Sequence, residues 1–261
     1  MNLPSIDTNA TASLLLETWR SRNVLAELPA SIRPVSLSQG YDAQDQLFKA
    51  VGCERGGWKL GVGSRAAMDT AGLSRPLIGQ LDRVRCHESG VHLAWPGPSP
   101  LTIECEIAFI IDRDLPPLLG RTIQAEDIRS TLLTFEIVRS RFINRKTVGW
   151  PSFVADNVGF EALVLGPSAC SGFSQQILDK LVETTVVSVD GVERSRALRG
   201  DLATDPVMAL QSLYAHAAER GITIRAGEVI STGALCEPFD LLEKGHVIQA
   251  RYLDRELSFS L

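Results

Sequence analysis

Two glutamates, Glu104 and Glu106, interrupt an otherwise apolar run, LTIECEIAFII, whose alternation is typical of a β-strand. Side chains two positions apart on a strand share one face, so the two carboxylates are neighbours, about 6.6 Å apart at Cα. The flanking positions on that face hold Thr102 and Ala108 and supply no cation. Two uncompensated like charges raise each other's pKa, and a bound cation is the simplest way to relieve them.

A strand that shows its glutamates to water is the alternative interpretation, and that pattern is common. Apolar Ala108 and Ile110 continue the same face, however, which favours the floor of a pocket. Further along, Glu136 interrupts a second apolar run, LLTFEIV, where an unpaired buried carboxylate would be costly. An ion pair with Arg139 or Arg141 would satisfy Glu136, and so would a metal ion shared with the first two glutamates.

Oxygen ligands with no histidine nearby favour a hard cation, which usually keeps coordination positions open to water and substrate. We therefore predict a Mg²⁺ or Mn²⁺ site formed by Glu104, Glu106 and Glu136.

The segments that position these residues fall into two predicted parts. Residues 1–55 are expected to be helical, with Thr8 or Asn9 capping one helix and Ser38 capping another. Residues 56–261 form the main body, in which short β-like runs dominate: WKLGV, LTIECEIAFII, GFEALVLG, TTVVSVDG, GEVISTGAL and HVIQARYL.

Helical patterns interrupt the predicted strands at 125–133, 175–182 and 205–219, and Gly221 follows the last as a C-terminal cap would. A tight hairpin is expected at Val189-Asp190-Gly191, which favours some antiparallel pairing. No GxGxxG motif opens a helix, so a nucleotide-binding Rossmann fold has little support.

Composition bounds the class of protein. The chain has 261 residues, 44% of them hydrophobic, and can bury a substantial core. Its net charge of −5, with acidic and basic residues interspersed, gives no basic face for nucleic acid. The start of the chain lacks the pattern of a secretory signal, and no run approaches the roughly 20 apolar residues of a membrane span. A soluble, cytoplasmic protein with five scattered, reduced cysteines is expected.

Four further motifs surround the acidic residues in a fixed order: GWKLG from Gly57, PLIGQL from Pro76, VADN from Val154 and AGEVISTG from Ala226. Together with the glutamates they resemble the motifs of the 2-keto-4-pentenoate hydratase and 4-oxalocrotonate decarboxylase branch of the fumarylacetoacetate hydrolase superfamily. The resemblance runs over residues 37–252. Each motif is only moderately specific, but five in the right order rarely arise by chance.

The resemblance implies an α+β fold, with a helical N-terminal region followed by a mixed β-roll or barrel-like core of the fumarylacetoacetate hydrolase C-terminal type. It also implies a divalent-metal site formed by the three glutamates, and assembly into homo-oligomers. The expected partner is a small 2-oxo acid, which can chelate the metal through a carboxylate oxygen and the 2-oxo oxygen. The metal would then stabilise the negative charge of an enolate.

The same resemblance implies roles for residues outside the metal site. Lys59 is expected to bind the substrate and take part in catalysis, although a lysine with its charge at the surface is the alternative. Asp156 is expected to support catalysis as a general acid or base or, as we prefer, by orienting Lys59, a water or a turn. Leu81, Thr232 and Gly233 complete the expected substrate-binding set, with an ordinary strand end as the alternative for the last two.

The leading expectation is a metal-dependent hydro-lyase that hydrates 2-hydroxypenta-2,4-dienoate to 4-hydroxy-2-oxopentanoate. A 4-oxalocrotonate-type decarboxylase would use the same metal chemistry, and the sequence does not separate the two. An acylpyruvate-type hydrolase would need a histidine and glutamate pair, but none of the four histidines lies in a recognisable motif. A catalytically inactive protein that binds the metal or the 2-oxo acid is the remaining alternative.

The chain departs from the family pattern near the VADN motif. Family hydratases usually carry alanine and serine there, whereas this chain has Val158 and Gly159 and so lacks a serine that can hydrogen-bond substrate or water. Ile78 stands where an acidic residue is often found, and the preceding segment 146–152 is also unusual. These departures leave the metal site intact and bear on which reaction follows.

Overall fold

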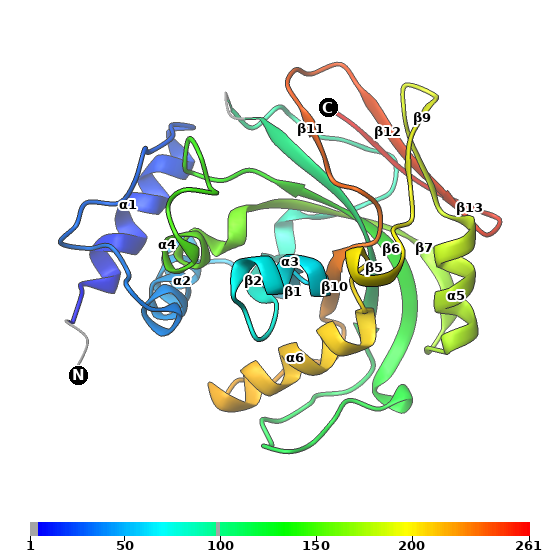
Figure 1. The fold of residues 1–261 in the computed structure, drawn as a ribbon, viewed down its shortest axis with the longest axis horizontal. Helices are drawn as coiled ribbons and strands as arrows, with labels where there is room; N and C mark the ends of the chain where they lie inside the picture. Colours follow the sequence, from blue (N-terminus) through cyan, green and yellow to red (C-terminus); the bar gives the residue numbers. More distant parts are fainter. Residues whose placement is uncertain (1–4, 98–99) are drawn as a thin grey trace.

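The computed structural model describes residues 5–97 and 100–261; residues 1–4, at the start of the N-terminal segment considered above, and residues 98–99 lie outside it. The chain has an α+β fold in which N-terminal helices precede a curled mixed sheet, so the predicted fold class is confirmed (Figure 1).

The N-terminal region consists of helices α1 (Thr8–Arg20) and α2 (Leu37–Val51), which pack together with α4 (Trp150–Ala155) at one side of the molecule (Figure 1). Their apolar side chains share one cluster with residues of the main body, including Leu15, Leu47, Phe142 and Ala155. The division of the chain at residues 55 and 56 stays a prediction, because this cluster joins the two parts.

The caps of both helices differ from the predicted ones. Asp7 caps α1 and Ser36 caps α2, each with an extended backbone and a side-chain oxygen that accepts hydrogen bonds from first-turn N–H groups. The predicted caps at Thr8 or Asn9 and at Ser38 are therefore wrong by one or two positions.

Eight strands form the large sheet. Seven follow the spatial order β2 (Leu77–Asp82), β1 (Arg55–Gly61), β10 (Val229–Ala234), β5 (Leu101–Ile111), β6 (Ile128–Val138), β7 (Phe160–Ser171) and β3 (Cys86–Glu88). The eighth, β11 (Phe239–Leu241), pairs with the beginning of β5. The sheet is mixed, since β1 runs parallel to β10 whereas β5 is antiparallel to both β10 and β6.

A second sheet has the order β4 (Val91–His92), β13 (Arg255–Ser260), β12 (Val247–Tyr252), β8 (Val186–Val189) and β9 (Val192–Arg196). The predicted hairpin at Val189-Asp190-Gly191 is confirmed: β8 and β9 are antiparallel, and Asp190 and Gly191 both have positive φ angles, as such a turn requires.

Two of the three predicted internal helices are confirmed, as α5 (Gln175–Thr184) and α6 (Pro206–Glu219); a short helix, α3 (Arg65–Ala71), follows β1. The helix predicted at 125–133 is wrong. Only a single 3₁₀ turn, Ala125–Asp127, forms there, and β6 begins at Ile128 because the segment completes the sheet between β5 and β7.

The large sheet curls around an apolar layer on its inner face. Side chains from five strands meet in this layer, including β2 and β7, which lie far apart in the strand order. Its members are Leu81, Ala108, Leu132, Phe160, Leu163 and Val229, with Ile110 packed against them. The prediction that Ala108 and Ile110 continue the glutamate face as apolar, inward-facing residues is thus confirmed.

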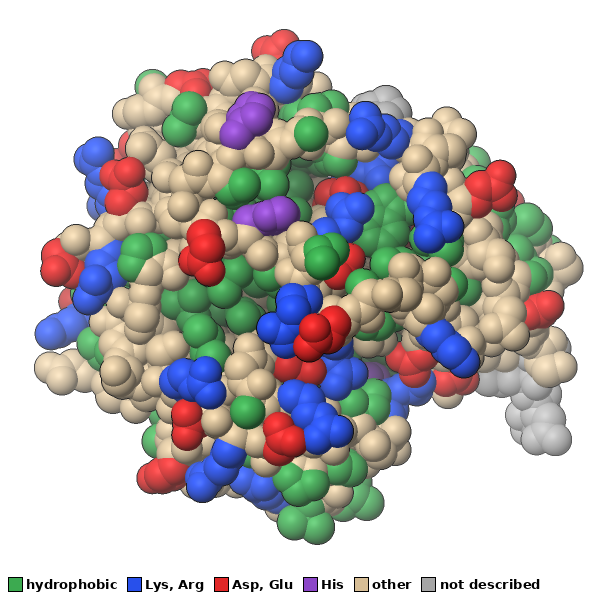
Figure 2. Space-filling model, turned by 180° about the vertical axis from the view of Figure 1, so that it is seen from behind, with side chains coloured by type: hydrophobic (Ala, Val, Ile, Leu, Met, Phe, Trp, Pro, Cys, Tyr) green, Lys and Arg blue, Asp and Glu red, His purple; other side chains and the backbone are tan. Residues whose placement is uncertain are grey.

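The surface carries charges of both signs. On the face seen in Figure 2, Lys and Arg side chains (blue) are interspersed with Asp and Glu side chains (red). All five cysteines are free thiols. Within residues 5–97 and 100–261, no helix combines the length and the apolar character that a bilayer span needs.

Gly57 allows the backbones of β1 and β10 to approach each other closely, and a substitution there tests this contact. It pairs with Val229 across β1 and β10 at a φ of 151°, and an added Cβ would lie 1.9 Å from the carbonyl oxygen of Val229. We expect Gly57→Ala to lower the free energy of unfolding by about 3 kcal/mol or more, because the backbone clash adds to the conformational cost. Urea denaturation measures this.

Gly52→Ala is the matched control. Gly52 also has a positive φ, but nothing lies within 4 Å of its added Cβ, so only the conformational cost of about 1–2 kcal/mol applies. Equal losses in the two variants would contradict the importance of this close approach.

Candidate metal centre

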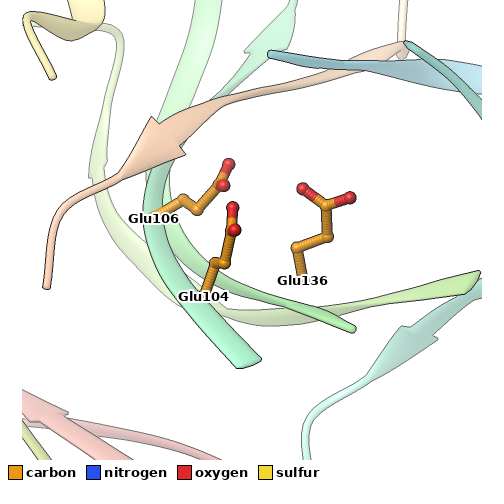
Figure 3. A group of neighbouring side chains, drawn as sticks. All are labelled: Glu104, Glu106 and Glu136. Atoms are coloured by element: carbon orange, nitrogen blue, oxygen red, sulfur yellow. The ribbon is translucent and has the colours of Figure 1, made fainter. Parts of the chain in front are cut away.

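The three predicted metal ligands converge on the inner face of the large sheet (Figure 3). Glu104 on β5 pairs directly with Glu136 on the antiparallel strand β6, and Glu106 follows two positions along on the same face. Each residue offers a carboxylate oxygen within 4.8 Å of the others. Like charges directly opposite one another destabilise a sheet, so this arrangement calls for a compensating charge.

Glu106 is fully buried and is held by neighbouring donors. The Ser231 hydroxyl, at 2.6 Å, and the Gly233 N–H, at 2.9 Å, both donate to its Oε2. Ser231 also forms a 2.7 Å hydrogen bond with the hydroxyl of Thr134 on β6. The Oε1 atom of Glu106 is buried without a hydrogen-bond partner among the described residues, so it remains available to a ligand.

Glu136 is also fully buried, and its partner is Lys59. The Lys59 Nζ lies 2.9 Å from Oε1 of Glu136 and donates a hydrogen bond to the Val158 carbonyl oxygen, 3.1 Å away. The alternative partners predicted for Glu136 are wrong, because Arg139 pairs with Glu161 and Arg141 with Asp156.

The electrostatics fit a divalent cation. Burial, and then the charges of Glu136 and Glu104, raise the pKa of Glu106 well above its usual range. Burial raises the pKa of Glu136 to about 7, although the Lys59 ammonium opposes the shift. If all three carboxylates ionise, as metal ligation requires, they and the Lys59 ammonium carry a formal charge of −2. A hard divalent cation neutralises that charge and supplies partners for the orphaned oxygens.

A cavity of about 170 Å³ lies beside Lys59 and Glu104. Its wall combines cations with apolar and aromatic side chains: Gly61, Val62, Val138, Arg145, Lys146, Trp150, Phe153 and Val158. A small anion with an unsaturated carbon chain suits this lining, since the cations face its charge and the apolar wall its carbons.

Val158 occupies a left-handed backbone conformation, with φ 52°. This conformation is strained for a β-branched residue, at a cost of about 1–3 kcal/mol, and it turns the Val158 carbonyl towards Lys59. The side chain of Val158 lines the cavity.

Asp156 and Asn157 hold this turn from two sides. The fully buried Asp156 carboxylate accepts hydrogen bonds from the Ser140 hydroxyl and the Arg141 backbone N–H, and it pairs with the Arg141 guanidinium. The Asn157 amide exchanges two 2.8 Å hydrogen bonds with the backbone of Gln80 on β2. Asp156 thus fixes the turn that presents the Val158 carbonyl.

Lys59 lines the cavity, whereas the other three residues predicted to bind substrate do not. The side chain of Leu81 lies in the apolar layer behind the carboxylates and does not line the cavity. The Thr232 hydroxyl donates to the carbonyl oxygen of Ile107, and the Gly233 N–H donates to Glu106. In this geometry the Gly233 backbone holds Glu106 in place, and substrate contacts by Leu81 and Thr232 receive no support.

Ser231 and Thr134 were missed from sequence. Ser231, on β10, points towards Glu106. The alternation of side chains along that strand would have identified it as an inward-facing polar residue. Thr134 could not be found, because its contact with Ser231 depends on the registers of β10 and β6 against β5.

Comparisons with known proteins agree with this geometry. Residues 71–255 match the fumarylacetoacetate (FAA) hydrolase C-terminal family, and the chain belongs to this family. A 2-hydroxyhexa-2,4-dienoate hydratase of Comamonas testosteroni is 29% identical over 230 residues, covering 85% of this chain and 84% of its own. A 2-keto-4-pentenoate hydratase of Paraburkholderia phymatum is 26% identical over 238 residues, covering 86% of each.

Among solved structures, the 4-oxalocrotonate decarboxylase of Pseudomonas putida G7, complexed with magnesium and adipate, superposes with a TM-score of 0.81. It is 22% identical and covers 97% of this chain and 96% of its own. The structural likeness shows the fold, and the names of the curated relatives support an enzyme of this superfamily.

Glu106→Gln tests whether the carboxylates bind a cation. At about 100 times its Kd, a bound ion stabilises a protein by about 2.7 kcal/mol, so we expect Mg²⁺ to raise the Tm of the parent protein. The variant should lose most of this rise, yet be at least as stable as the parent without metal, because a neutral amide replaces a buried carboxyl whose ionised form is disfavoured there. Differential scanning fluorimetry with and without EDTA measures both effects.

Glu183→Gln, at an exposed position on α5, is the control and should respond to Mg²⁺ like the parent protein. An equal Mg²⁺ response in the Glu106 variant would contradict the site.

The raised pKa of Glu136 predicts how the metal-free protein responds to pH. In the unfolded chain this group has a pKa of about 4.3, and in the folded protein the pKa is about 7. The folded state therefore holds the proton more tightly, and the stability that this provides is present at low pH and lost as pH rises towards 7. The difference in Tm between metal-free Glu136→Gln and the metal-free parent should therefore shift in favour of the variant as pH rises from 5.5 to 8. A constant difference would contradict the assigned pKa.

Proposed function

We propose that the chain is a metal-dependent hydro-lyase that adds water to a 2-hydroxydienoic acid, with 2-hydroxypenta-2,4-dienoate hydrated to 4-hydroxy-2-oxopentanoate as the simplest case. The observation that carries the proposal is the group of three carboxylates, two of them fully buried, which lies beside Lys59 and next to a small cavity of mixed cationic and apolar lining. Two relatives named as hydratases support the same reaction class.

Glu104, Glu106 and Glu136 would hold the cation, Mg²⁺ or Mn²⁺. The decarboxylase of similar fold, which is complexed with magnesium, supports this choice. When bound, such a cation supplies positive charge where a 2-oxo acid develops enolate character. Oε1 of Glu106 and Oε2 of Glu136, which have no partner among the described residues, are the coordination positions that these two buried residues offer.

Lys59 is the residue we assign to proton handling. Its ammonium is fixed by Glu136 and by the Val158 carbonyl, so one further N–H is available towards the cavity that Lys59 lines. From there Nζ can bind a substrate carboxylate or oxo oxygen and move a proton to or from the carbon chain. Asp156 contributes by holding the turn that presents Val158, which makes it a positioning residue.

The cavity wall would orient the diene. Trp150, Phe153 and Val158 offer apolar surface to the conjugated carbons, and a narrow apolar wall limits water near the reacting chain. No side-chain hydroxyl is among the described residues that line this cavity, so the attacking water would be held by charged groups there, such as Glu104 and Lys59.

Decarboxylation of a 4-oxalocrotonate-type acid is the second candidate. Arg145 and Lys146 line the same cavity and would suit the additional carboxylate of such a substrate. A histidine-dependent hydrolase receives less support, because no histidine is among the residues that line this cavity.

The experiment is an assay of 2-hydroxypenta-2,4-dienoate and 4-oxalocrotonate by loss of ultraviolet absorbance, with products identified by mass spectrometry. We expect Mg²⁺-dependent formation of the hydrated product. Release of CO₂ from 4-oxalocrotonate would favour the second candidate, and metal binding without turnover would favour a binding protein.

Lys59→Met tests whether the Lys59 ammonium takes part in catalysis. Loss of the ammonium should reduce kcat by about 10²-fold or more, the range usual for removing a positioned proton donor. The matched control is Lys49→Met, at an exposed position of α2, and it should retain activity. Similar kcat values for both variants would contradict the role of Lys59.

A further inference from the structure

A cavity of about 470 Å³ lies apart from the candidate metal centre, where the end of α1 meets β2 and the start of β7. We call this cavity the Trp19 pocket, after the indole in its wall. None of the residues that line it also lines the cavity beside Lys59. The Trp19 pocket is therefore a separate site on the molecule.

The Trp19 pocket has a surplus of positive charge. Four guanidiniums against two carboxylates give it a formal charge of +2, within a protein whose net charge is −5. A surplus of this sign in a concave site attracts anions. The charged residues that line the pocket are Arg20, Arg22, Arg85, Arg139, Asp82 and Glu161.

Arg139 is buried in the wall of the pocket, and its guanidinium is only partly satisfied. Its Nε donates to Oε2 of Glu161 at 3.0 Å, whereas its Nη1 is buried without a hydrogen-bond partner in the part of the chain that the structure describes. Arg85 uses the other oxygen of the same carboxylate, with Nη1 2.7 Å from Oε1. One carboxylate thus serves two arginines, and Nη1 of Arg139 calls for a further acceptor.

Two more arginines stand over the same spot. Arg20 and Arg22 are exposed, and neither forms an ion pair with any residue within 5–97 and 100–261. Arg22 has a left-handed backbone, with φ 57°, at a position after a helix where glycine is usual. A Cβ added at Gly97 would lie 3.2 Å from Nη1 of Arg139 and 3.6 Å from Cβ of Arg22, so these two arginines meet at Gly97.

An ordinary role exists for the two exposed arginines. Basic side chains at the end of a helix complement the helix dipole, and Arg20 and Arg22 lie at the end of α1. That role does not involve Arg139, which is buried and belongs to the segment after β6. Three arginines from two parts of the chain therefore converge on one point.

An apolar wall completes the pocket beside these cations. Leu16, Trp19 and Val51 line it. The indole is fixed in place: its Nε1 donates to Glu161 at 2.9 Å, and the Arg85 guanidinium lies 4.4 Å from the ring centroid. The cavity is many times the roughly 30 Å³ that one water occupies in the liquid and falls in the range of small-molecule sites. It suits an anion that carries an organic group.

We propose that the Trp19 pocket binds the phosphate monoester of a small organic molecule. A phosphate monoester carries a charge of about −1.5 to −2 at pH 7, which matches the surplus of the pocket. Guanidinium forks donate paired N–H groups to phosphate oxygens, and Arg20, Arg22 and Arg139 supply them. The organic group packs against Trp19 and Leu16. This binding uses none of the three glutamates.

The test is isothermal titration calorimetry of the full chain with phenyl phosphate, benzoate and inorganic phosphate, each with Mg²⁺ and in metal-free buffer. Benzoate keeps the ring with about half the charge, and inorganic phosphate keeps the charge without the ring. We expect phenyl phosphate to bind about tenfold more tightly than either, with the same Kd in both buffers.

The double variant Arg20→Gln, Arg22→Gln should weaken phenyl phosphate binding about tenfold, because two charge-assisted contacts are lost together. Both positions are exposed and unpaired among the described residues, so the Tm should not change. Arg65→Gln, Arg199→Gln is the matched control. It removes the same charge from two exposed arginines outside the pocket and should keep the Kd of the parent protein.

Each other outcome overturns the proposal. Equal weakening in the two double variants, or none in either, would mean that the pocket is not where the anion binds. Binding that requires Mg²⁺ would place the anion at the glutamates. Benzoate or inorganic phosphate binding as tightly as phenyl phosphate would contradict the ligand class, and no measurable binding of any of the three would remove the site altogether.

Discussion

Carboxylates facing one another across two paired strands are the constraint on which the rest of the site depends. Glu104 and Glu136 are directly opposite in the register of β5 and β6, and Glu106 lies beside them in full burial. One ammonium, from Lys59, is too little to balance them. The fold tolerates this arrangement only because packing elsewhere outweighs its cost, and a divalent cation would remove most of that cost.

The surrounding structure serves to keep these charges in place. An apolar layer packs next to them on the inner face of the sheet. Ser231 and Gly233 donate hydrogen bonds that fix Oε2 of Glu106. On the other side, a strained turn aims the Val158 carbonyl at Lys59, and Asp156 holds that turn through Arg141. Strain of this kind is expected where a site must be rigid before its ligand arrives.

Local patterns predicted much of this fold and part of the site. The alternation around Glu104 and Glu106 placed both carboxylates on one inward face, and the apolar Ala108 marked that face as a pocket floor. At 125–133 the apolar spacing resembles that of a helix, but pairing with two neighbouring strands produces β6 from Ile128 onward. Tertiary pairing overrides a weak local preference.

Contacts that depend on register could not be predicted from sequence. The partner of Glu136 is Lys59, more than seventy positions earlier, rather than either arginine nearby, because β1 and β6 are brought together only by the order of the sheet. The family resemblance pointed to Lys59, which lines the cavity, and also to Leu81 and Thr232, whose side chains are engaged elsewhere. Motifs thus identify residues, while the curl of the sheet decides what each one touches.

The most direct measurement is a crystal structure of the protein grown with Mn²⁺, with data collected to locate manganese by anomalous scattering. We expect one strong anomalous peak at coordination distance from oxygens of Glu104, Glu106 and Glu136. No peak there, or a peak bound by other residues while the three glutamates remain without a cation, would contradict it.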